Sequence, residues 1–279
     1  MAVYGLLPTY TIMKNKKKLA LANKEVLIMA GEILSNLAKE VNMPIIPIDS
    51  EHSAIFQSIN GNNPNDIERI ILTASGGPFR AKTKEELKKV TFEQAVKHPT
   101  WNMGRNISIN SSTLMNKGFE VIEAKWLFDM PIEKVDVIIH PQSIIHSMVE
   151  YKDGIIMGQL GPADMRLPIQ YALTYPKRQK NNFDRLDFTK YNTLTFEKPD
   201  MDKFKCLKLS FDAIKIGGTM PLVLCVANEI AINKFANKEI EYIDIPSFIE
   251  AKMQAHTVKY NSTIEELLEL ESSIKTSHN

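Results

Sequence analysis

Hydrophobic and polar positions near the start of the chain follow the order strand, helix, strand. A short apolar run, Leu19–Ala22, predicts a buried strand, and apolar residues then recur at helical spacing from Leu27 to Val41. The β-branched run Ile45–Ile48 predicts a second strand. Units of this kind build parallel sheets covered by helices, so the pattern predicts an α/β fold. We interpret residues 1–48 as the end of a larger α/β domain.

In the middle of the chain, over residues 49–176, the pattern predicts further strands around a long loop. Residues 75–105 show little regular pattern beyond one short helix, and loops of this length are usually lids or disordered segments. The alternation from Asn106 to Asn110 predicts a half-buried strand, and Thr113–Phe128 predicts a helix. The remaining predicted elements are strands over Arg69–Thr73 and Val135–Ile139 and a hairpin over Met148–Leu160 around Asp153-Gly154.

The pattern becomes entirely helical towards the end of the chain. Residues 177–203 are polar and irregular, which predicts a linker. Four amphipathic helices are then expected, over 204–216, 221–235, 246–256 and 263–275. Short loops join them, so residues 204–279 are predicted to form a C-terminal α-helical domain.

Composition narrows the class of protein. Lys and Arg number 34 against 33 Asp and Glu, for a net charge of +1, which gives no reason to expect a nucleic-acid partner or an anionic membrane surface. No apolar run is long enough to span a bilayer. The two cysteines do not make a disulfide framework, which favours a reducing compartment. We therefore expect an ordinary globular protein with no nucleic-acid or membrane partner.

Acidic residues follow the second predicted strand. If that strand continues, Asp49 and Glu51 are two residues apart and share a face at the carboxyl end of a parallel strand, where open α/β sheets place ligands. Paired carboxylates there suit a hard divalent cation. The alternative is a helix N-terminus carrying acids, which the helix dipole favours. The tetrapeptide alone leaves both interpretations open.

A second polar cluster lies at the start of the helix expected from Thr113. Hydroxyls such as that of Ser111 beside a helix N-terminus can bind a phosphate, and Lys117 adds a positive charge. Asn116 and Glu120 are four residues apart and therefore lie on one helix face. Glu120 is thus a candidate third metal ligand. Ordinary helix capping is the alternative for this cluster.

The long loop carries a third group of candidate residues. Ser75 opens it with Gly76-Gly77-Pro78, and His98, Trp101 and Met103 lie near its end. An imidazole and apolar side chains beside a glycine suit a lid that closes over a ligand and excludes water. Taken alone, a histidine beside a tryptophan is more often a packing feature.

These motifs together resemble the 1-deoxy-D-xylulose 5-phosphate reductoisomerase family. The likeness runs from Tyr4 to about Asn233 and rests on many motifs in the family's order. They include Leu21-Ala22-Asn23-Lys24-Glu25, Asp49-Ser50-Glu51-His52, Ser75-Gly76-Gly77-Pro78, Met115-Asn116-Lys117-Gly118, His140-Pro141-Gln142-Ser143 and Asp164-Met165-Arg166.

The resemblance implies roles for individual residues. It implies Mg²⁺ or Mn²⁺ ligands at Asp49, Glu51 and Glu120, and NADPH contacts at Asn23, Glu25 and Gly104. His146 and Met165 match further residues that line the pocket, Met165 on the cofactor side. Lys24 and His98 are expected to act in catalysis beside the three carboxylates. The implied contacts to a sugar phosphate are Lys24, Ser50, Glu51, Ser75, His98, Trp101, Met103, Ser111, Asn116, Lys117 and Glu120.

The resemblance also implies an architecture and a partner. It implies a remnant of a Rossmann-type NADPH domain (1–48), a catalytic and dimerisation domain with a mixed sheet (49–176), a linker (177–203) and a C-terminal α-helical domain (204–279), assembled as a homodimer. The family's Gly-rich cofactor turn has no counterpart in the first 50 residues. Roughly 100 residues of that domain are expected to be absent, so this chain alone is expected to be inactive.

Three functions remain open at this level. The first is NADPH-dependent and metal-dependent rearrangement and reduction of 1-deoxy-D-xylulose 5-phosphate to 2-C-methyl-D-erythritol 4-phosphate, in non-mevalonate isoprenoid biosynthesis. The second is a module that binds metal and sugar phosphate without chemistry, and the third is an isomerase that needs no nicotinamide. The expected compartment is a plastid-type organelle, hinted at by the many Lys, Asn and Ile residues, or the bacterial cytoplasm.

Overall fold

A computed structural model describes residues 2–97 and 104–276 of the chain. Its strands are β1 (Leu19–Leu21), β2 (Ile45–Pro47), β3 (Ile67–Ala74), β4 (Val135–Ile139), β5 (Ile145–Tyr151) and β6 (Ile156–Leu160). Its first eight α-helices are α1 (Leu6–Lys14), α2 (Lys24–Glu40), α3 (Ser50–Ile59), α4 (Lys84–Leu87), α5 (Phe92–Ala95), α6 (Arg105–Ser112), α7 (Met115–Phe128) and α8 (Arg166–Thr174). Four more follow: α9 (Lys205–Ile216), α10 (Met220–Ala236), α11 (Ile245–Gln254) and α12 (Ile264–Thr276). Short 3-10 helices cover Ala2–Gly5, Pro64–Asp66, Ile132–Lys134 and Tyr242–Asp244.

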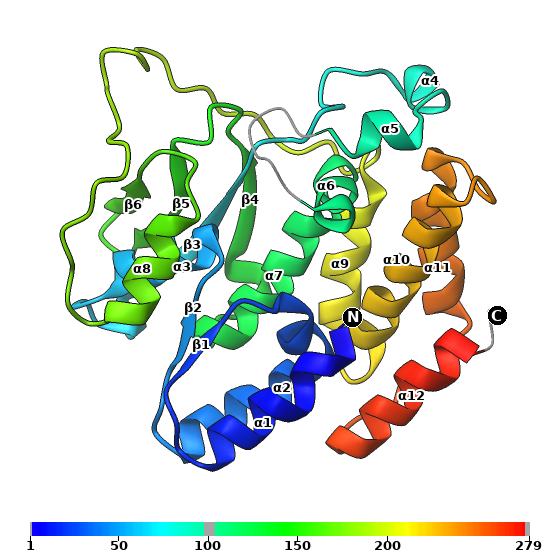
Figure 1. The fold of residues 1–279 in the computed structure, drawn as a ribbon, viewed down its shortest axis with the longest axis horizontal. Coiled ribbons are helices and arrows are strands. Elements are labelled where there is room, and N and C mark those ends of the chain that lie inside the picture. The colour runs from blue at the N-terminus through cyan, green and yellow to red at the C-terminus, as the bar shows by residue number, and fades with distance from the viewer. Residues whose placement is uncertain (1, 98–103, 277–279) are drawn as a thin grey trace.

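The strands form two separate sheets. Strands β1 and β2 pair in parallel, with α2 as their crossover, as the pattern predicts. The larger sheet has the order β4-β3-β5-β6 and is mixed, because β3 is parallel to β4 and antiparallel to β5. The predicted α/β fold with a mixed sheet and C-terminal helices is therefore confirmed, and Figure 1 shows the sheet to one side of the helical part.

Helices α3 and α7 pack beside each other on one face of the larger sheet. Helix α3 contacts β5 and β6, α7 contacts β3 and β4, and the two helices contact each other. Buried Val149 and Tyr151 of β5 lie under them, and the Tyr151 hydroxyl donates to the carbonyl of Ser58 in α3 (3.0 Å). The acidic residues discussed below lie near the N-terminal ends of α3 and α7, where their carboxylate oxygens come within 4.8 Å of one another.

The helical end of the molecule packs directly onto this layer (Figure 1). Helix α7 lies between α2 and α9, and α10 contacts α2, α9, α11 and α12. The buried apolar side chains form one contiguous core, whose members range along the chain from Leu6 to Leu267. None of the described helices combines the length and the hydropathy that a membrane span requires. The domain boundaries at residues 48, 176 and 203 stay a prediction.

Two predicted elements are wrong. Residues 106–110 belong to helix α6, and their alternation is misleading because two of the polar side chains, Ser108 and Asn110, are buried and hydrogen-bonded. The Ser108 hydroxyl donates to the Gly104 carbonyl (3.0 Å) and that of Ser112 to the Ile109 carbonyl (2.8 Å). The second strand ends at Pro47, so Asp49 and Glu51 are not strand neighbours. Instead, Asp49 caps α3 and Glu51 lies in its first turn, as the alternative interpretation proposed.

Helices α7 and α9 approach each other through a glycine. A Cβ on Gly118 would lie 2.1 Å from the hydroxyl oxygen and 2.6 Å from the Cβ of Ser210. We expect Gly118→Ala to destabilise the protein by about 1–3 kcal/mol through overpacking, although Ala is the better helix former by about 1 kcal/mol. In a Ser210→Gly background the clash is absent, so the same change should be stabilising. Urea unfolding of the four proteins measures this change of sign, and destabilisation of equal size in both backgrounds would contradict it.

Candidate active site

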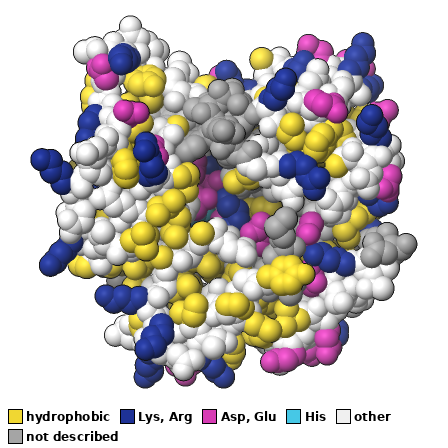
Figure 2. All heavy atoms as spheres, viewed as in Figure 1, with side chains coloured by type: hydrophobic (Ala, Val, Ile, Leu, Met, Phe, Trp, Pro, Cys, Tyr) yellow, Lys and Arg dark blue, Asp and Glu magenta, His cyan; other side chains and the backbone are white. Residues whose placement is uncertain are grey.

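The loops and helix ends around the larger sheet enclose one cavity of about 260 Å³ that carries most of the predicted site residues. In the space-filling view of Figure 2, acidic and basic side chains lie at the bottom of a central hollow. The predicted residues that line the cavity are Lys24, Asp49, Ser50, Glu51, Ser75, Ser111, Asn116, Lys117, Glu120 and Met165. Segments that lie up to 141 positions apart in the sequence, from Lys24 to Met165, therefore converge here.

Three acidic residues converge at the junction of α3 and α7. Asp49, Glu51 and Glu120 each offer a carboxylate oxygen, and these oxygens all lie within 4.8 Å of one another. The Asp49 side chain accepts from the Glu51 backbone N–H (3.2 Å), which fixes the two at the start of α3. Asn116 donates to Glu120 across one turn of α7 (2.6 Å), as the predicted four-residue spacing requires. Close-set oxygen donors of this kind are the ligands that hard divalent cations prefer.

Two lysines, the half-buried Lys24 and the buried Lys117, lie among the acidic residues. The Lys24 ammonium donates to Asp49 (2.7 Å) and to the Asn116 side-chain oxygen (3.0 Å). The Lys117 ammonium pairs with Glu120 and lies 3.2 Å from Glu51. Burial disfavours both cations, yet the surrounding carboxylates outweigh it, so the pKa of each lysine is raised. Both lysines therefore stay charged at neutral pH.

Crowding of like charges perturbs Glu120 most clearly. Burial, and then repulsion from Glu51, raise the pKa of Glu120 to about 8, although Lys117 opposes the shift. The pKa of Asp49, by contrast, lies well below its usual range: burial opposes ionisation, but Lys24 and His52 outweigh it. A divalent cation among these carboxylates would relieve the repulsion at Glu120. The donor set present in the structure therefore fits Mg²⁺ or Mn²⁺.

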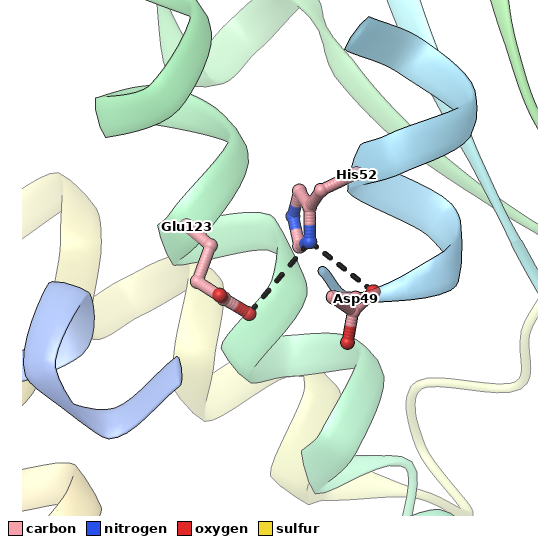
Figure 3. A group of neighbouring side chains, drawn as sticks. All are labelled: Asp49, His52 and Glu123. Atoms are coloured by element: carbon pink, nitrogen blue, oxygen red, sulfur yellow. Dashed lines mark ion pairs between the residues drawn. The ribbon is translucent and has the colours of Figure 1, made fainter. Parts of the chain in front are cut away.

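Behind these ligands lies a second acidic group that the sequence interpretation did not identify. Asp49, His52 and Glu123 place a ring nitrogen and two carboxylate oxygens within 4.8 Å of one another (Figure 3). Burial raises the pKa of Glu123 to about 7, and Glu123 and Asp49 outweigh the burial of His52 and raise its pKa to about 9. The three-residue spacing of Glu120 and Glu123 puts them on one helix face, and this spacing could have pointed to Glu123.

The serine cluster is arranged differently from the prediction. Ser111 lies in the last turn of α6, and Leu114 turns the chain in the left-handed region (φ 60°) before α7 begins. The junction is therefore helix to helix rather than strand to helix. Gly77 approaches it closely, since a Cβ there would lie 2.6 Å from the Ser111 carbonyl oxygen. Ser75, Ser111 and Lys117 nonetheless line the same cavity, so an anion could contact all three.

The other predicted residues lie outside this cavity or outside the described part of the chain. Asn23 and Glu25 flank Lys24 at the start of α2, and Gly104 precedes α6. His146 lies at a neighbouring cavity, which Ser50 also lines, and its ring approaches the Gly161 and Pro162 carbonyl oxygens (both 3.2 Å). His98, Trp101 and Met103, the proposed lid residues, fall outside the described residues. Ile107, Leu114 and Ser143 also line the main cavity and were not predicted.

Comparison with known proteins identifies the family. Residues 45–128 match a family model described as 1-deoxy-D-xylulose 5-phosphate reductoisomerase C-terminal domain, and residues 160–277 match one described as DXP reductoisomerase C-terminal domain. Residues 1–31 match a third model, described as 1-deoxy-D-xylulose 5-phosphate reductoisomerase. Together these models account for most of the chain.

Individual relatives agree. The chain is 55% identical over 266 residues to the 1-deoxy-D-xylulose 5-phosphate reductoisomerase of Acetivibrio thermocellus, covering 95% of this chain and 70% of that protein. The enzyme of the same name from Chlorobium chlorochromatii is 56% identical over 267 residues, with 96% and 70% covered.

Solved structures show the same likeness. The Zymomonas mobilis reductoisomerase in complex with NADPH has a TM-score of 0.93 at 43% identity, over 99% of this chain and 72% of that one. A DOX-P reductoisomerase in complex with NADPH, fosmidomycin and magnesium has a TM-score of 0.93 at 38% identity, with 98% and 72% covered. The 279-residue chain belongs to the 1-deoxy-D-xylulose 5-phosphate reductoisomerase family.

Proposed function

We propose that this protein takes part in the NADPH-dependent and metal-dependent conversion of 1-deoxy-D-xylulose 5-phosphate to 2-C-methyl-D-erythritol 4-phosphate. The observation that carries the proposal is the group of Asp49, Glu51 and the buried Glu120, which lies in the same cavity as Ser75 and Ser111. A metal-ligand set and a potential anion site in one cavity suit a sugar phosphate, whose two ends differ in charge. The relatives named above carry the name of this enzyme, and two of the solved ones contain NADPH.

The residues divide into two groups by what they would do. Asp49, Glu51 and Glu120 would hold Mg²⁺ or Mn²⁺, which when bound supplies Lewis acidity towards adjacent substrate oxygens. Lys24 donates to Asp49 and Asn116 and thus presents a fixed positive charge to the cavity. Ser75, Ser111 and Lys117 would anchor the phosphate and orient the reacting end of the substrate. Met165 borders the cavity, where we propose that it faces the nicotinamide.

The N-terminal part of the sequence bears on whether the 279 residues can complete the reduction by themselves. The chain covers 70 to 72% of the length of the relatives named above, and its first 50 residues contain no Gly-rich dinucleotide turn. Asn23, Glu25 and Gly104 would touch NADPH only at its edge. We therefore expect the 279 residues by themselves to bind metal and substrate without reducing it.

Calorimetry with fosmidomycin tests this function. The compound is bound with magnesium in a structural relative, and its phosphonate would stand in for the substrate phosphate. We expect binding to the 279-residue chain in Mn²⁺ and no binding in EDTA. Absence of binding in both conditions would refute the proposed site. Parallel assays of NADPH oxidation and of product distinguish the reductoisomerase from a binding module and from an isomerase that needs no nicotinamide.

Metal binding should depend on pH through Glu120. A carboxylate must be ionised to bind a cation, and the pKa of Glu120 is raised to about 8 in the metal-free protein. Below that pH, binding must therefore release a proton, so Mn²⁺ affinity should rise about tenfold per pH unit from pH 6 to 8 and then level off. Calorimetry in two buffers of different ionisation enthalpy counts the released protons. A constant affinity from pH 6 to 8 would contradict the expectation.

We further propose that the protein forms a homodimer through β6, the edge strand of its larger sheet. This strand ends the sheet, and within the described residues no strand pairs with its outer side. Ile155, Ile156, Met157 and Leu160 on or beside it are 40–58% exposed, which is unusual for an edge strand left in water. Sedimentation should find a dimer that Ile156→Lys dissociates and that Tyr260→Lys, at an exposed aromatic far from β6 in sequence, leaves intact. A monomeric wild-type chain would refute the dimer.

The relatives named above also bear on the compartment. Three of them come from Acetivibrio, Chlorobium and Zymomonas, which are bacteria. Of the two compartments expected from the sequence, we therefore propose the bacterial cytoplasm rather than a plastid-type organelle.

A further inference from the structure

His52 and Glu123 form a buried pair directly behind the proposed metal ligands. The His52 side chain is fully buried, Glu123 is 3% exposed, and neither lines the cavity. Figure 3 shows the ring between the two carboxylates: its Nδ1 lies 3.3 Å from Asp49 Oδ1 and 3.8 Å from Glu123 Oε2. Since neither side chain reaches the cavity, any influence on the site must pass through the residues they contact.

The second ring nitrogen of His52 joins α3 to α7. Nε2 donates to the backbone carbonyl of Glu120 (2.9 Å), while Nδ1 faces the side chain of Asp49. Asp49 stands at the start of α3 and Glu120 in α7, so one rigid ring spans the two elements that carry the proposed ligands. The distance between these two carboxylates therefore depends on the position of the ring.

The two carboxylate oxygens of Asp49 have different contacts. Oδ1 accepts from the Glu51 backbone N–H (3.2 Å) and faces His52, so the protein interior holds it. Oδ2 accepts from Lys24, which itself lines the cavity (2.7 Å). Holding one oxygen inside leaves the other directed towards the cavity, where a cation would bind.

Glu123 faces two of the groups that surround Asp49, the His52 ring and the Lys24 ammonium. Its Oε2 lies 3.8 Å from His52 Nδ1 and 4.0 Å from the Lys24 ammonium, and it has no hydrogen-bond partner among the described residues. A buried acceptor with no other partner is costly unless it faces positive charge. Glu123 therefore favours the ring orientation in which Nδ1 points at Asp49.

We infer that His52 is a positioning residue for the divalent-cation site, with Glu123 fixing its ring. His52 sets the orientation of Asp49 and its separation from Glu120 without touching the cation or the substrate. The inference rests on the proposed function, because it assumes that Asp49 and Glu120 bind a cation. Partners behind metal ligands typically change metal affinity by about 10- to 100-fold when they are replaced.

Two substitutions separate the two contacts of the ring. In His52→Asn the amide nitrogen falls near the position of Nδ1 and can still face Asp49, whereas in His52→Gln it falls near Nε2 and can reach only the Glu120 carbonyl. We expect His52→Gln to weaken Mn²⁺ binding by about 10- to 100-fold and His52→Asn to retain more of the affinity. Calorimetry with Mn²⁺ alone measures the affinities, and thermal unfolding is recorded in parallel.

A second buried histidine serves as the matched control. His140 is also fully buried, with contacts to the Thr195 carbonyl (3.0 Å) and the Ile144 backbone N–H (3.2 Å), and it lies outside the cavity. His140→Gln and His140→Asn should lower thermal stability and leave the Mn²⁺ affinity within about twofold of the wild type. A loss of Mn²⁺ affinity in these variants as large as in His52→Gln would overturn the inference, because any buried histidine would then have the same effect.

The outcomes separate this inference from the proposed function. If the wild-type chain does not bind Mn²⁺, the proposed metal site itself fails. If the wild type binds and His52→Gln binds equally well, or His52→Asn is the weaker of the two, only the positioning role fails. Should His52→Gln not fold, Glu123→Gln is the second test. It should reduce Mn²⁺ affinity by about tenfold, and unchanged affinity would overturn the inference.

Discussion

Replacing Glu120 by Gln should abolish detectable Mn²⁺ binding and, with it, metal-dependent binding of fosmidomycin. Glu120 is fully buried and supplies one of the three carboxylates, and an amide keeps its shape but loses the negative charge. Without that charge, Lys117 and Lys24 face one fewer anion and oppose a cation more strongly. We expect a loss of at least about a hundredfold in Mn²⁺ affinity, by calorimetry at pH 8.

The same substitution should leave the metal-free fold intact. The pKa of Glu120 is raised to about 8 in the folded protein. The ionisation of Glu120 therefore lowers the stability as the pH rises from the pKa of this group in the unfolded chain towards 8. Gln does not incur this cost, and the variant should therefore be at least as stable as the wild type at pH 8.5 without metal. Glu271→Gln is the control, because Glu271 is a buried glutamate paired with Lys275 in α12. This substitution should leave the Mn²⁺ affinity unchanged. Retained Mn²⁺ binding in Glu120→Gln would exclude Glu120 as a ligand.

Replacing Gly77 by Ala should disable the proposed anion site without removing the metal ligands. Gly77 has φ +67°, where an L-residue is strained by about 1–2 kcal/mol, and its Cβ would meet the Ser111 carbonyl oxygen at 2.6 Å. Backbone cannot move aside as a side chain can, so the loop from Ser75 or the end of α6 must shift. We expect stability to fall by about 2–5 kcal/mol and fosmidomycin affinity by at least tenfold, with Mn²⁺ affinity nearly unchanged.

A substitution at a second glycine separates the effect of positive φ from the effect of the close contact with Ser111. Gly61 also has positive φ (+85°), but nothing lies within 4 Å of the Cβ it lacks. Gly61→Ala should therefore cost only about 1–2 kcal/mol and leave binding of both ligands unchanged. Urea unfolding and calorimetry compare the two variants. Equal losses of stability at the two positions would show that the contact with Ser111 is not as close as described.

Periodicity along the chain was sufficient for most of the fold. The parallel pair of β1 and β2 follows from two short apolar runs around an amphipathic helix, the hairpin of β5 and β6 from its turn at Asp153-Gly154, and α7 from its helical spacing. It failed at α6, because the polar Ser108 and Asn110 are buried there by hydrogen bonds to the Gly104 carbonyl and to Asn228, which hydrophobicity alone cannot reveal.

Most of the predicted site residues meet in one cavity, but the predicted geometry was partly wrong. Asp49 and Glu51 come together through a helix cap rather than a strand, and their role as metal ligands stays a prediction. Glu123 was missed because a single glutamate within an amphipathic helix has the appearance of a surface residue until its partners are known. Its partners, His52 and Lys24, are 71 and 99 positions earlier in the sequence, and only the fold brings them together.

The close contact at Gly118 also bears on how the enzyme could evolve resistance to an inhibitor. Helix α7 carries Asn116, Lys117 and Glu120 towards the cavity and meets Ser210 of α9 at Gly118, within the same turn. The helix therefore cannot slide or rotate to accommodate a larger side chain on its cavity face, because the opposite face has no free space. Variants that escape a cavity-binding compound are for this reason expected around Met165, whose side chain is 37% exposed, rather than on the cavity face of α7.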